Sequence, residues 1–220
     1  MVVIVNGLFR TGSTLVFQLV KELLNVKGVC YDLPISEIDK QENYTENYVI
    51  KNHGYFPKVQ RNYFKIVLTI RNVYDSIFSS MKVWPEKFEK DRESEIRLMV
   101  QNYKNFLNEY MLFESENPGQ CLLISYEHFY NDNVHLINSL CKFLNLDISG
   151  DARAIIANYN SIESIKEKIG EGVDPKQIAY GQFRKGHISD YNGLPGYGKA
   201  YMQENLKKII YDELKNDSSF

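Results

Sequence analysis

The sequence contains few cysteines and no spacing that would pair them or bind zinc. Three cysteines occur among 220 residues, none in a C-x-x-C pattern, so neither a disulfide framework nor a zinc site is indicated. Free thiols are typical of a reducing compartment, and we therefore expect a cytoplasmic protein. The start MVVIVNG lacks the basic residues that precede the apolar core of a secretory signal peptide, which agrees with that expectation.

The chain also lacks long apolar segments and a strong net charge. Its apolar runs are much shorter than the ~20 residues that a membrane-spanning helix needs, so no membrane span is predicted. A formal net charge of -2 provides no general electrostatic attraction to nucleic acid. We therefore expect neither a membrane nor a nucleic acid as partner, and any anionic ligand must be held by local clusters of cations.

The composition is that of a globular domain. Hydrophobic residues make up 44% of the chain and charged residues 25%, a balance typical of soluble folded proteins. A chain of this length buries roughly 70% of the surface that its unfolded form exposes, which is enough for a core without covalent cross-links. No repeat or linker divides the sequence, so residues 1–220 are predicted to form a single domain.

Short β-branched runs alternate with stretches of helical periodicity. The predicted strands are Val2–Val5, Tyr48–Lys51, Phe64–Ile70 and Cys121–Ser125. The predicted helices are Ser13–Leu24, Asn72–Lys82, Glu93–Ser115, Val134–Leu144, Ala152–Asn158, Ile162–Ile169 and Lys199–Lys215. Such alternation implies right-handed crossovers, so the predicted fold class is α/β, with three α/β/α layers around a central, mostly parallel sheet. The glycine-rich stretch from Gly170 to Gly198 is the longest predicted loop.

The segment GLFRTGST, Gly7 to Thr14, connects the first predicted strand to the first helix. It matches the phosphate-binding pattern G-x-x-x-x-G-K-[ST] except that Ser13 stands in the lysine position. Backbone N–H groups and a helix N-terminus favour a bound phosphate or sulfate there, whereas the lysine that reaches a triphosphate is absent. Arg10, inside the loop, could contact the far end of such an anion. The alternative is a simple glycine turn with a solvated arginine.

Two further basic segments could bind phosphate. Arg71 follows a predicted strand and Ser79 lies two helical turns later, so both could face one phosphate at the strand end. A strand of Walker type would end in a magnesium-binding aspartate, whereas a cation suits a phosphate bound without metal. The alternative is a surface arginine. Arg184 and Lys185 precede Gly186 in the glycine-rich stretch, where the alternative is a solvated charged turn.

Lys51 and His53 provide a candidate base beside a cation. They lie two residues apart at the end of the strand YVIK, so in extended geometry their side chains point to the same side. Histidine can take a proton from a hydroxyl or amine near neutral pH, and an adjacent cation keeps the imidazole unprotonated. The alternative is a structural histidine before a glycine turn.

In this order, the segments resemble the sulfotransferases that use 3′-phosphoadenosine 5′-phosphosulfate (PAPS). The family's loop P-[KR]-[ST]-G-[ST]-[ST] resembles FRTGST at residues 9–14, and its strand motif I-K-T-H resembles IKNH at residues 50–53. Its motif R-N-P-x-D-x-x-x-S resembles residues 71–79, its Y-E-D segment resembles residues 126–128, and its R-K-G loop resembles residues 184–186. Each motif is short, but five of them occur in the family's order.

The resemblance implies a P-loop-like sulfotransferase fold, PAPS as donor, the bisphosphate PAP as product, and no metal. The donor-binding residues that it implies are Arg10, Thr11, Gly12, Ser13 and Thr14 at the 5′ side, Arg71, Ser79, Arg184, Lys185 and Gly186 at the 3′-phosphate, and Tyr126 near adenine. The catalytic residues that it implies are His53, Lys51 and Arg10. His53 would be the base of an in-line displacement, while Lys51 and Arg10 stabilise charge on the leaving phosphate.

The chain departs from the family at several of these positions. Arg10 stands where cytosolic members have lysine, and because arginine keeps its proton it can act only electrostatically. Leu15 stands where a tryptophan stacks on adenine, which leaves Tyr126 and the Ser161–Ile162 segment to contact the base. Phe9 and Val73 replace prolines.

The sequence therefore predicts a sulfotransferase that acts on a hydroxyl or amine of a small-molecule acceptor, such as a polar secondary metabolite. The alternatives are a P-loop kinase or other nucleotide phosphotransferase, and a nucleotide-binding module without catalysis. The expected acceptor lining is the segment 31–48, Tyr55, Trp84 and the loop from Gly170 to Gly181. Acidic residues in the first of these segments favour a polar or cationic acceptor. The oligomeric state stays open.

Overall fold

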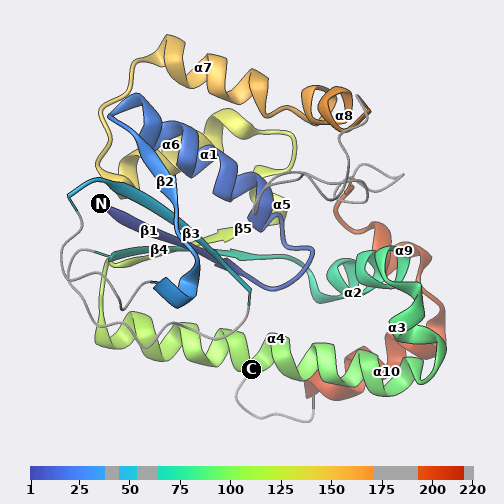
Figure 1. Cartoon of the computed structure of the whole chain (residues 1–220). Helices are drawn as coiled ribbons and strands as arrows, with labels where there is room; N and C mark the ends of the chain where they lie inside the picture. The colour runs from blue at the N-terminus through green and yellow to red at the C-terminus, as the bar shows by residue number, and fades with distance from the viewer. Residues whose placement is uncertain (38–44, 54–63, 171–192, 216–220) are drawn as a thin grey trace.

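The computed structural model describes residues 1–37, 45–53, 64–170 and 193–215, and in this part of the chain five strands form one parallel sheet (Figure 1). The strands are β1 (Val2–Gly7), β2 (Cys30–Asp32), β3 (Asn47–Asn52), β4 (Phe64–Ile70) and β5 (Cys121–Ser125), in the spatial order β2-β3-β1-β4-β5. β1 pairs with β3 on one side and with β4 on the other. The chain order therefore reverses at β1, in the middle of the sheet.

Helices cover both faces of the sheet, which explains why residues Val2–Val5 of the central strand are all apolar and fully buried. On one face lie α1 (Ser13–Val26), α6 (Asn133–Leu144) and α7 (Gly150–Tyr159), and on the other lies α4 (Arg92–Glu116) (Figure 1). Successive side chains of a strand point to opposite faces. Accordingly, Val3 and Val5 pack in the core beneath α1 and α6, while Val2 and Ile4 pack in the core that includes Phe106 of α4. The predicted three-layer α/β/α fold is confirmed.

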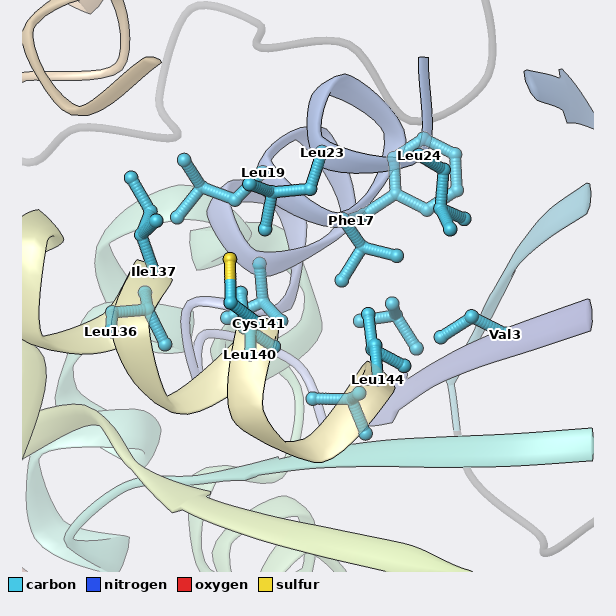
Figure 2. Packing of buried hydrophobic residues seen from close by; sticks show 14 of the residues in the cluster. Val3, Phe17, Leu19, Leu23, Leu24, Leu136, Ile137, Leu140, Cys141 and Leu144 are labelled. Carbon is cyan, nitrogen blue, oxygen red and sulfur yellow. The ribbon is translucent and has the colours of Figure 1, made fainter. Parts of the chain in front are cut away.

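The core on the α1 face is built from the apolar stripes of two helices. Figure 2 shows leucines of α1 and α6 filling the space between these helices and β1. Helical spacing places the buried residues of each helix on one side, because residues three and four apart share a face. The buried α1 residues are Ser13, Val16, Phe17, Leu19, Val20, Leu23 and Leu24, and those of α6 are Leu136, Ile137, Leu140, Cys141 and Leu144.

A separate core forms beyond the carboxyl ends of the strands. It joins the first half of α4 to α2 (Val73–Val83), α3 (Pro85–Glu89) and α10 (Glu204–Lys215), and it includes Met202, which follows α9 (Tyr197–Tyr201). Ile96 and Val100 of α4 share this core with Leu206 and Ile210 of α10. The ammonium of Lys104 donates to the Glu213 carbonyl over 3.0 Å, which satisfies a lysine buried between the two helices. The last helix, α10, is thus packed against α4 next to the carboxyl ends of the strands.

Most predicted elements are present, with differences where elements are short. The predicted helix Lys199–Lys215 is wrong in its continuity, because buried Met202 has extended backbone (ψ 143°) and separates α9 from α10. Periodicity did not predict the three-residue β2, whose Tyr31 and Asp32 are exposed. Periodicity also did not predict three other short elements, which are η1 (Ile35–Glu37), α3 and α5 (Tyr126–Phe129). The helix α8 (Ile162–Gly170) agrees with its prediction. Elements of three to five residues are too short to establish a period.

Within the described ranges, no helix has both the length and the apolar character required to cross a bilayer. The single domain predicted for residues 1–220 stays a prediction.

Replacing Leu140 by alanine tests the core of Figure 2. Its side chain is 0% exposed, so we expect Leu140→Ala to lower the free energy of unfolding by about 2–5 kcal/mol through lost burial and a residual cavity. Val134, on the same helix, is 52% exposed, and Val134→Ala should change it by less than about 0.5 kcal/mol. Urea denaturation measures both. Equal effects of the two substitutions would contradict the packing described.

Candidate active site

The candidate residues follow the carboxyl ends of four parallel strands. The loop that begins after Gly7 follows β1, His53 follows β3, Arg71 follows β4 and Tyr126 follows β5. Parallel strands end at one edge of the sheet, and open α/β sheets bind ligands at this edge, near the position where the strand order reverses. Figure 1 shows α2 and the start of α1 leaving from this edge. The topology therefore gathers motifs that lie far apart in the sequence.

The glycine loop is held tightly against β4. A Cβ on Gly7 would lie 2.0 Å from the hydroxyl oxygen of Thr69, so only glycine fits there. The Thr11 hydroxyl donates to the Leu8 carbonyl over 2.7 Å. The Thr69 hydroxyl, 2.8 Å from that of Thr11, must then be the donor of the second bond. These contacts fix the loop conformation, in which Arg10 (φ 69°) and Gly12 (φ 85°) are both left-handed.

The loop leads directly into the N-terminus of α1, where backbone donors are free of helical partners. The first helical bond runs from the Val16 N–H to the Gly12 carbonyl over 3.2 Å, and no side chain caps this end. The N–H groups before Val16 have no helix carbonyl to bind. Together with the dipole of the 14-residue helix, these groups favour an anion at this position. Thr11, Gly12, Ser13 and Thr14, predicted to hold the 5′-phosphate, therefore lie where an anion can be bound.

Lys51 and His53 contact the same loop from β3. The buried Lys51 ammonium donates to the Thr14 hydroxyl over 2.5 Å. His53 Nδ1 lies 2.8 Å from the Gly7 carbonyl, and since a carbonyl only accepts, Nδ1 carries the proton. In the neutral ring Nε2 then holds the lone pair, and this atom has no hydrogen-bond partner among the described residues.

The imidazole of His53 is held in the uncharged form. Part of its ring is open to solvent, but the protein atoms around it desolvate the charged form and lower the pKa of His53 from 6.5. The hydrogen bond to Gly7 partly opposes this shift, and the positive charge of Lys51 lowers the pKa further. At neutral pH the ring is therefore a base with a fixed tautomer.

Arg71 is a buried cation whose Nε has no hydrogen-bond partner in the described structure. Its side chain is 4% exposed and lies over the Tyr126 ring, 4.2 Å from the ring centre. One terminal nitrogen donates to the Gly193 carbonyl over 2.8 Å, and the other lies 3.4 Å from the Arg10 carbonyl. The nearest oxygen of Asp75 is 3.9 Å away, and Nε is buried without a hydrogen-bond partner in the described structure. A buried orphan donor on a cation indicates a site for an anionic ligand.

Arg10 and Ser79 contact each other directly. Arg10 Nε donates to the Ser79 hydroxyl over 2.8 Å. The sequence predicts that Ser79 shares a ligand with Arg71, and the carbonyl of Arg10 does lie beside the Arg71 guanidinium. The structure therefore brings Arg10, Arg71 and Ser79 into one cluster, with Ser79 bonded to the loop cation.

Two carboxylates in this region hold backbone groups, a role that the motifs did not reveal. Asp75 is fully buried and accepts the N–H groups of Gly196 (2.6 Å), Gly198 (2.8 Å) and Lys199 (3.3 Å). Glu127 accepts the Asn72 N–H over 2.7 Å and the Ser125 hydroxyl over 2.5 Å. In the sequence, Asp75 and Glu127 are marked only by lying inside motifs, which does not indicate that they bind backbone groups.

Two cavities flank the cluster. One, of about 350 Å³, opens beside Tyr126, and its lining includes Leu15, Ser161 and Ile162, the residues expected near adenine. The other, of about 270 Å³, is lined by Leu8, Phe9, His53, Val73, Ser76, Ile77, Met99, Asn102, Tyr103, Asn105, Phe106 and Glu109. The glycine loop and His53 thus lie between a cavity on the Tyr126 side and a largely apolar one against α2 and α4.

The second cavity differs from the acceptor lining expected from the sequence. No described residue of the segment 31–48 lines it, and Asp32 instead forms an ion pair with Lys21 at 2.7 Å. Trp84 does not line the cavity itself, but it contacts Phe9, which does; the two ring centres are 5.4 Å apart. The sequence did not predict that α4 residues line this cavity, because the helical spacing of their apolar side chains is already explained by packing against the core.

Several predicted residues lie outside the described part of the chain. These are Arg184, Lys185 and Gly186 of the basic loop, together with Tyr55 and the loop residues after Gly170 up to Gly181. Their placement stays a prediction. Among the residues that are described, no cluster of three or more His, Cys, Asp or Glu side chains could hold a metal ion.

Comparison with known proteins agrees with this geometry. Solved structures with the same fold include the mouse sulfotransferase SULT7A1 complexed with PAP, at a TM-score of 0.72 and 15% identity, covering 98% of this chain and 83% of that one. They also include retinol dehydratase in complex with androsterone and inactive cofactor PAP, at 0.70 and 16%, covering 99% of this chain and 81% of that one. A complex of retinol dehydratase with retinol and PAP matches at 0.70 and 17%, covering 99% and 82%.

A search of curated proteins gives no match to this chain. Its sequence does match a protein family, described as the sulfotransferase domain, over residues 2–216. Since this match extends over nearly the whole chain, the protein belongs to the sulfotransferase family.

Proposed function

We propose that this chain transfers the sulfuryl group of PAPS to a hydroxyl or amine of a small-molecule acceptor, with His53 as the base. One observation carries the proposal. Lys51 and the buried Arg71 contact the glycine loop that contains Arg10, and the Gly7 carbonyl of that loop also fixes the tautomer of His53. The candidate anion site and the neutral His53 imidazole are therefore both held by the same glycine loop. The PAP present in the matched solved structures is consistent with this donor.

The donor would be held by fixed charge and backbone N–H groups. Arg10 and the residues Thr11 to Thr14 bind the 5′-phosphate at the start of α1, where helix donors are free. Arg71 and Ser79 bind the 3′-phosphate together with Arg184, Lys185 and Gly186, and Tyr126 lies near adenine. The orphan Nε of Arg71 supports this fit, because a phosphate oxygen would satisfy it.

The residues of the site divide the chemistry between proton removal and charge stabilisation. PAPS, when bound, supplies a sulfuryl group whose bond to the phosphate oxygen breaks as the acceptor oxygen or nitrogen attacks sulfur. Nε2 of His53 takes the proton that the acceptor loses. Lys51 and Arg10 stabilise the negative charge that remains on the leaving phosphate, and Arg10 does so without giving up its proton.

The cavity beside His53 favours a small and largely apolar acceptor. Its volume is about 270 Å³, and Leu8, Phe9, Val73, Ile77, Met99 and Phe106 contribute apolar surface. Pockets of this kind use a few polar groups to orient a ligand, and Asn102, Asn105 and Glu109 supply them here along α4. The cavity therefore favours a compact hydroxyl or amine compound with a mostly apolar skeleton, and this differs from the polar acceptor that the acidic residues of segment 31–48 led us to expect.

Substitution of His53 tests the base. We expect His53→Ala to lower the single-turnover rate with PAPS about 10²–10⁴-fold, because no other group takes the proton, while the dissociation constant of PAP stays nearly unchanged. The rate is measured with a panel of phenols, alcohols and amines, and PAP binding by calorimetry. The exposed His135, on α6, provides the control His135→Ala, which should change neither quantity.

The pH profile is part of the same test. Because the pKa of His53 is lowered, the wild-type rate should be constant near neutral pH and fall only as the pH drops through that lowered pKa, where the ring becomes protonated. His53→Ala should remove this acid limb. An unchanged limb in the variant would assign the proton to another group.

Substitution of Arg71 tests the 3′-phosphate site. Because charged hydrogen bonds contribute about 1.5–3 kcal/mol, Arg71→Gln should weaken PAP binding about 10- to 100-fold. Binding of adenosine 5′-phosphate, which lacks the 3′-phosphate, should change little. Arg97→Gln, on the surface of α4, is the control. Equal losses for both nucleotides would mean that Arg71 supports the fold rather than the 3′-phosphate.

A further inference from the structure

The Phe9 ring packs on the imidazole of His53. The two ring centres are 5.0 Å apart and the planes are inclined by 29°, which is a stacked arrangement. Phe9 is 49% exposed, so burial alone does not explain a large aromatic residue inside a phosphate-type loop. The contact therefore needs a reason other than core packing.

A single hydrogen bond does not fix the orientation of His53. The bond from Nδ1 to the Gly7 carbonyl is a single contact, and the ring can leave it by tilting out of line with the carbonyl. Among the described residues no second hydrogen bond holds the ring, since Nε2 has no partner. Stacking on one face opposes the tilt. Aromatic pairs of this kind change the population of the stacked orientation by a factor of about 2 to 10.

Phe9 is itself held from its far side. The indole of Trp84 meets it edge to face, with ring centres 5.4 Å apart at 72°. The backbone N–H of Trp84 donates to the Ser80 carbonyl over 2.9 Å, and the Trp84 carbonyl accepts the backbone N–H of Lys87 over 3.1 Å, so the Trp84 backbone is fixed where α2 joins α3. The Lys87 ammonium lies 5.3 Å from the indole centre and 6.0 Å from the Phe9 ring centre. A row from Trp84 through Phe9 to His53 thus links α2 to the base.

We propose that Phe9 is a positioning residue that holds the His53 ring with Nε2 available to the acceptor. Phe9 and His53 both line the cavity against α2 and α4, so the stacked pair forms the end of this cavity at which the acceptor's proton is removed. Phe9 acts through His53 and takes no part in bond making. This inference rests on the proposed function for its catalytic meaning, whereas the orientation of the ring can be measured separately.

The test uses protein labelled with ¹⁵N in its four histidines, with no ligand present. Long-range ¹H–¹⁵N spectra report which ring nitrogen carries the proton, and His53→Ala assigns the His53 signals. His128 and His135, both exposed, serve as internal references. The variants are Phe9→Leu, which removes the ring, Phe9→Tyr, which keeps it, and Phe143→Leu as a control on α6 at another aromatic side chain.

We expect wild-type His53 to show the Nδ1–H tautomer alone. Phe9→Leu should reduce the fraction of this tautomer and raise the pKa of His53 toward 6.5, because water replaces the stacked ring. Phe9→Tyr should preserve both, and Phe143→Leu should change neither. A His53 spectrum that is unchanged in Phe9→Leu, or that changes equally in Phe9→Tyr or in Phe143→Leu, would overturn the proposal.

A calorimetric titration with PAP separates this inference from the proposed function. Phe9→Leu should bind PAP about as tightly as the wild type, since the substitution removes no cation and leaves the backbone N–H of residue 9 in place. Loss of PAP binding in Phe9→Leu alone would make Phe9 a part of the donor site and overturn its assignment to His53. A wild-type protein that binds no PAP would refute the proposed donor, while the histidine spectra would still decide whether Phe9 orients the ring.

Discussion

The close contact between the glycine loop and β4 is the constraint on which the site depends. Gly7 lies against the Thr69 hydroxyl at a distance that admits no Cβ, and Thr11 reaches the same hydroxyl from the other end of the loop. This contact turns the start of α1 toward the strand ends. The Gly7 carbonyl can then receive His53 from β3, and the Arg10 carbonyl lies beside Arg71. A loop displaced from β4 would separate His53 from Arg10 and Arg71.

The charges at the site are arranged so that its cations keep their capacity for an anion. Asp75 is close to Arg71, but its oxygens accept backbone N–H groups of the segment 196–199. Glu127 likewise accepts a backbone N–H and a hydroxyl. Because these carboxylates position the chain instead of forming close ion pairs, Arg71 retains an orphan donor. Fixed positive charge in a partly buried site binds phosphate groups more strongly than the same charge in water.

Sequence reasoning predicted those parts of the fold and site that rest on local patterns. Neighbouring residues alone reveal the apolar run of β1, the helical period of α1 and the presence of Arg10 in the glycine loop. The structure confirms the three-layer fold that these patterns predicted. The sequence placed Lys51, His53 and Arg71 at the ends of predicted strands, and the resemblance implied that they share one site with the loop; in the structure all three contact the loop. The sequence did not predict that Phe9 stacks on His53 or that Asp75 binds the segment after Gly193, since both contacts join residues far apart in the chain.

The sequence by itself determined that this protein has an α/β fold with a glycine loop that lacks the P-loop lysine, and that its family is that of the sulfotransferases. Such features depend on short-range periodicity and on motifs whose chemistry is carried by residue type. Only the tertiary structure decided which space lies beside the base. The cavity at His53 is walled by α2 and α4, and no described residue of the acidic segment 31–48 lines it. Helices from distant parts of the chain form that wall, so their facing residues were set by packing, which no local pattern records.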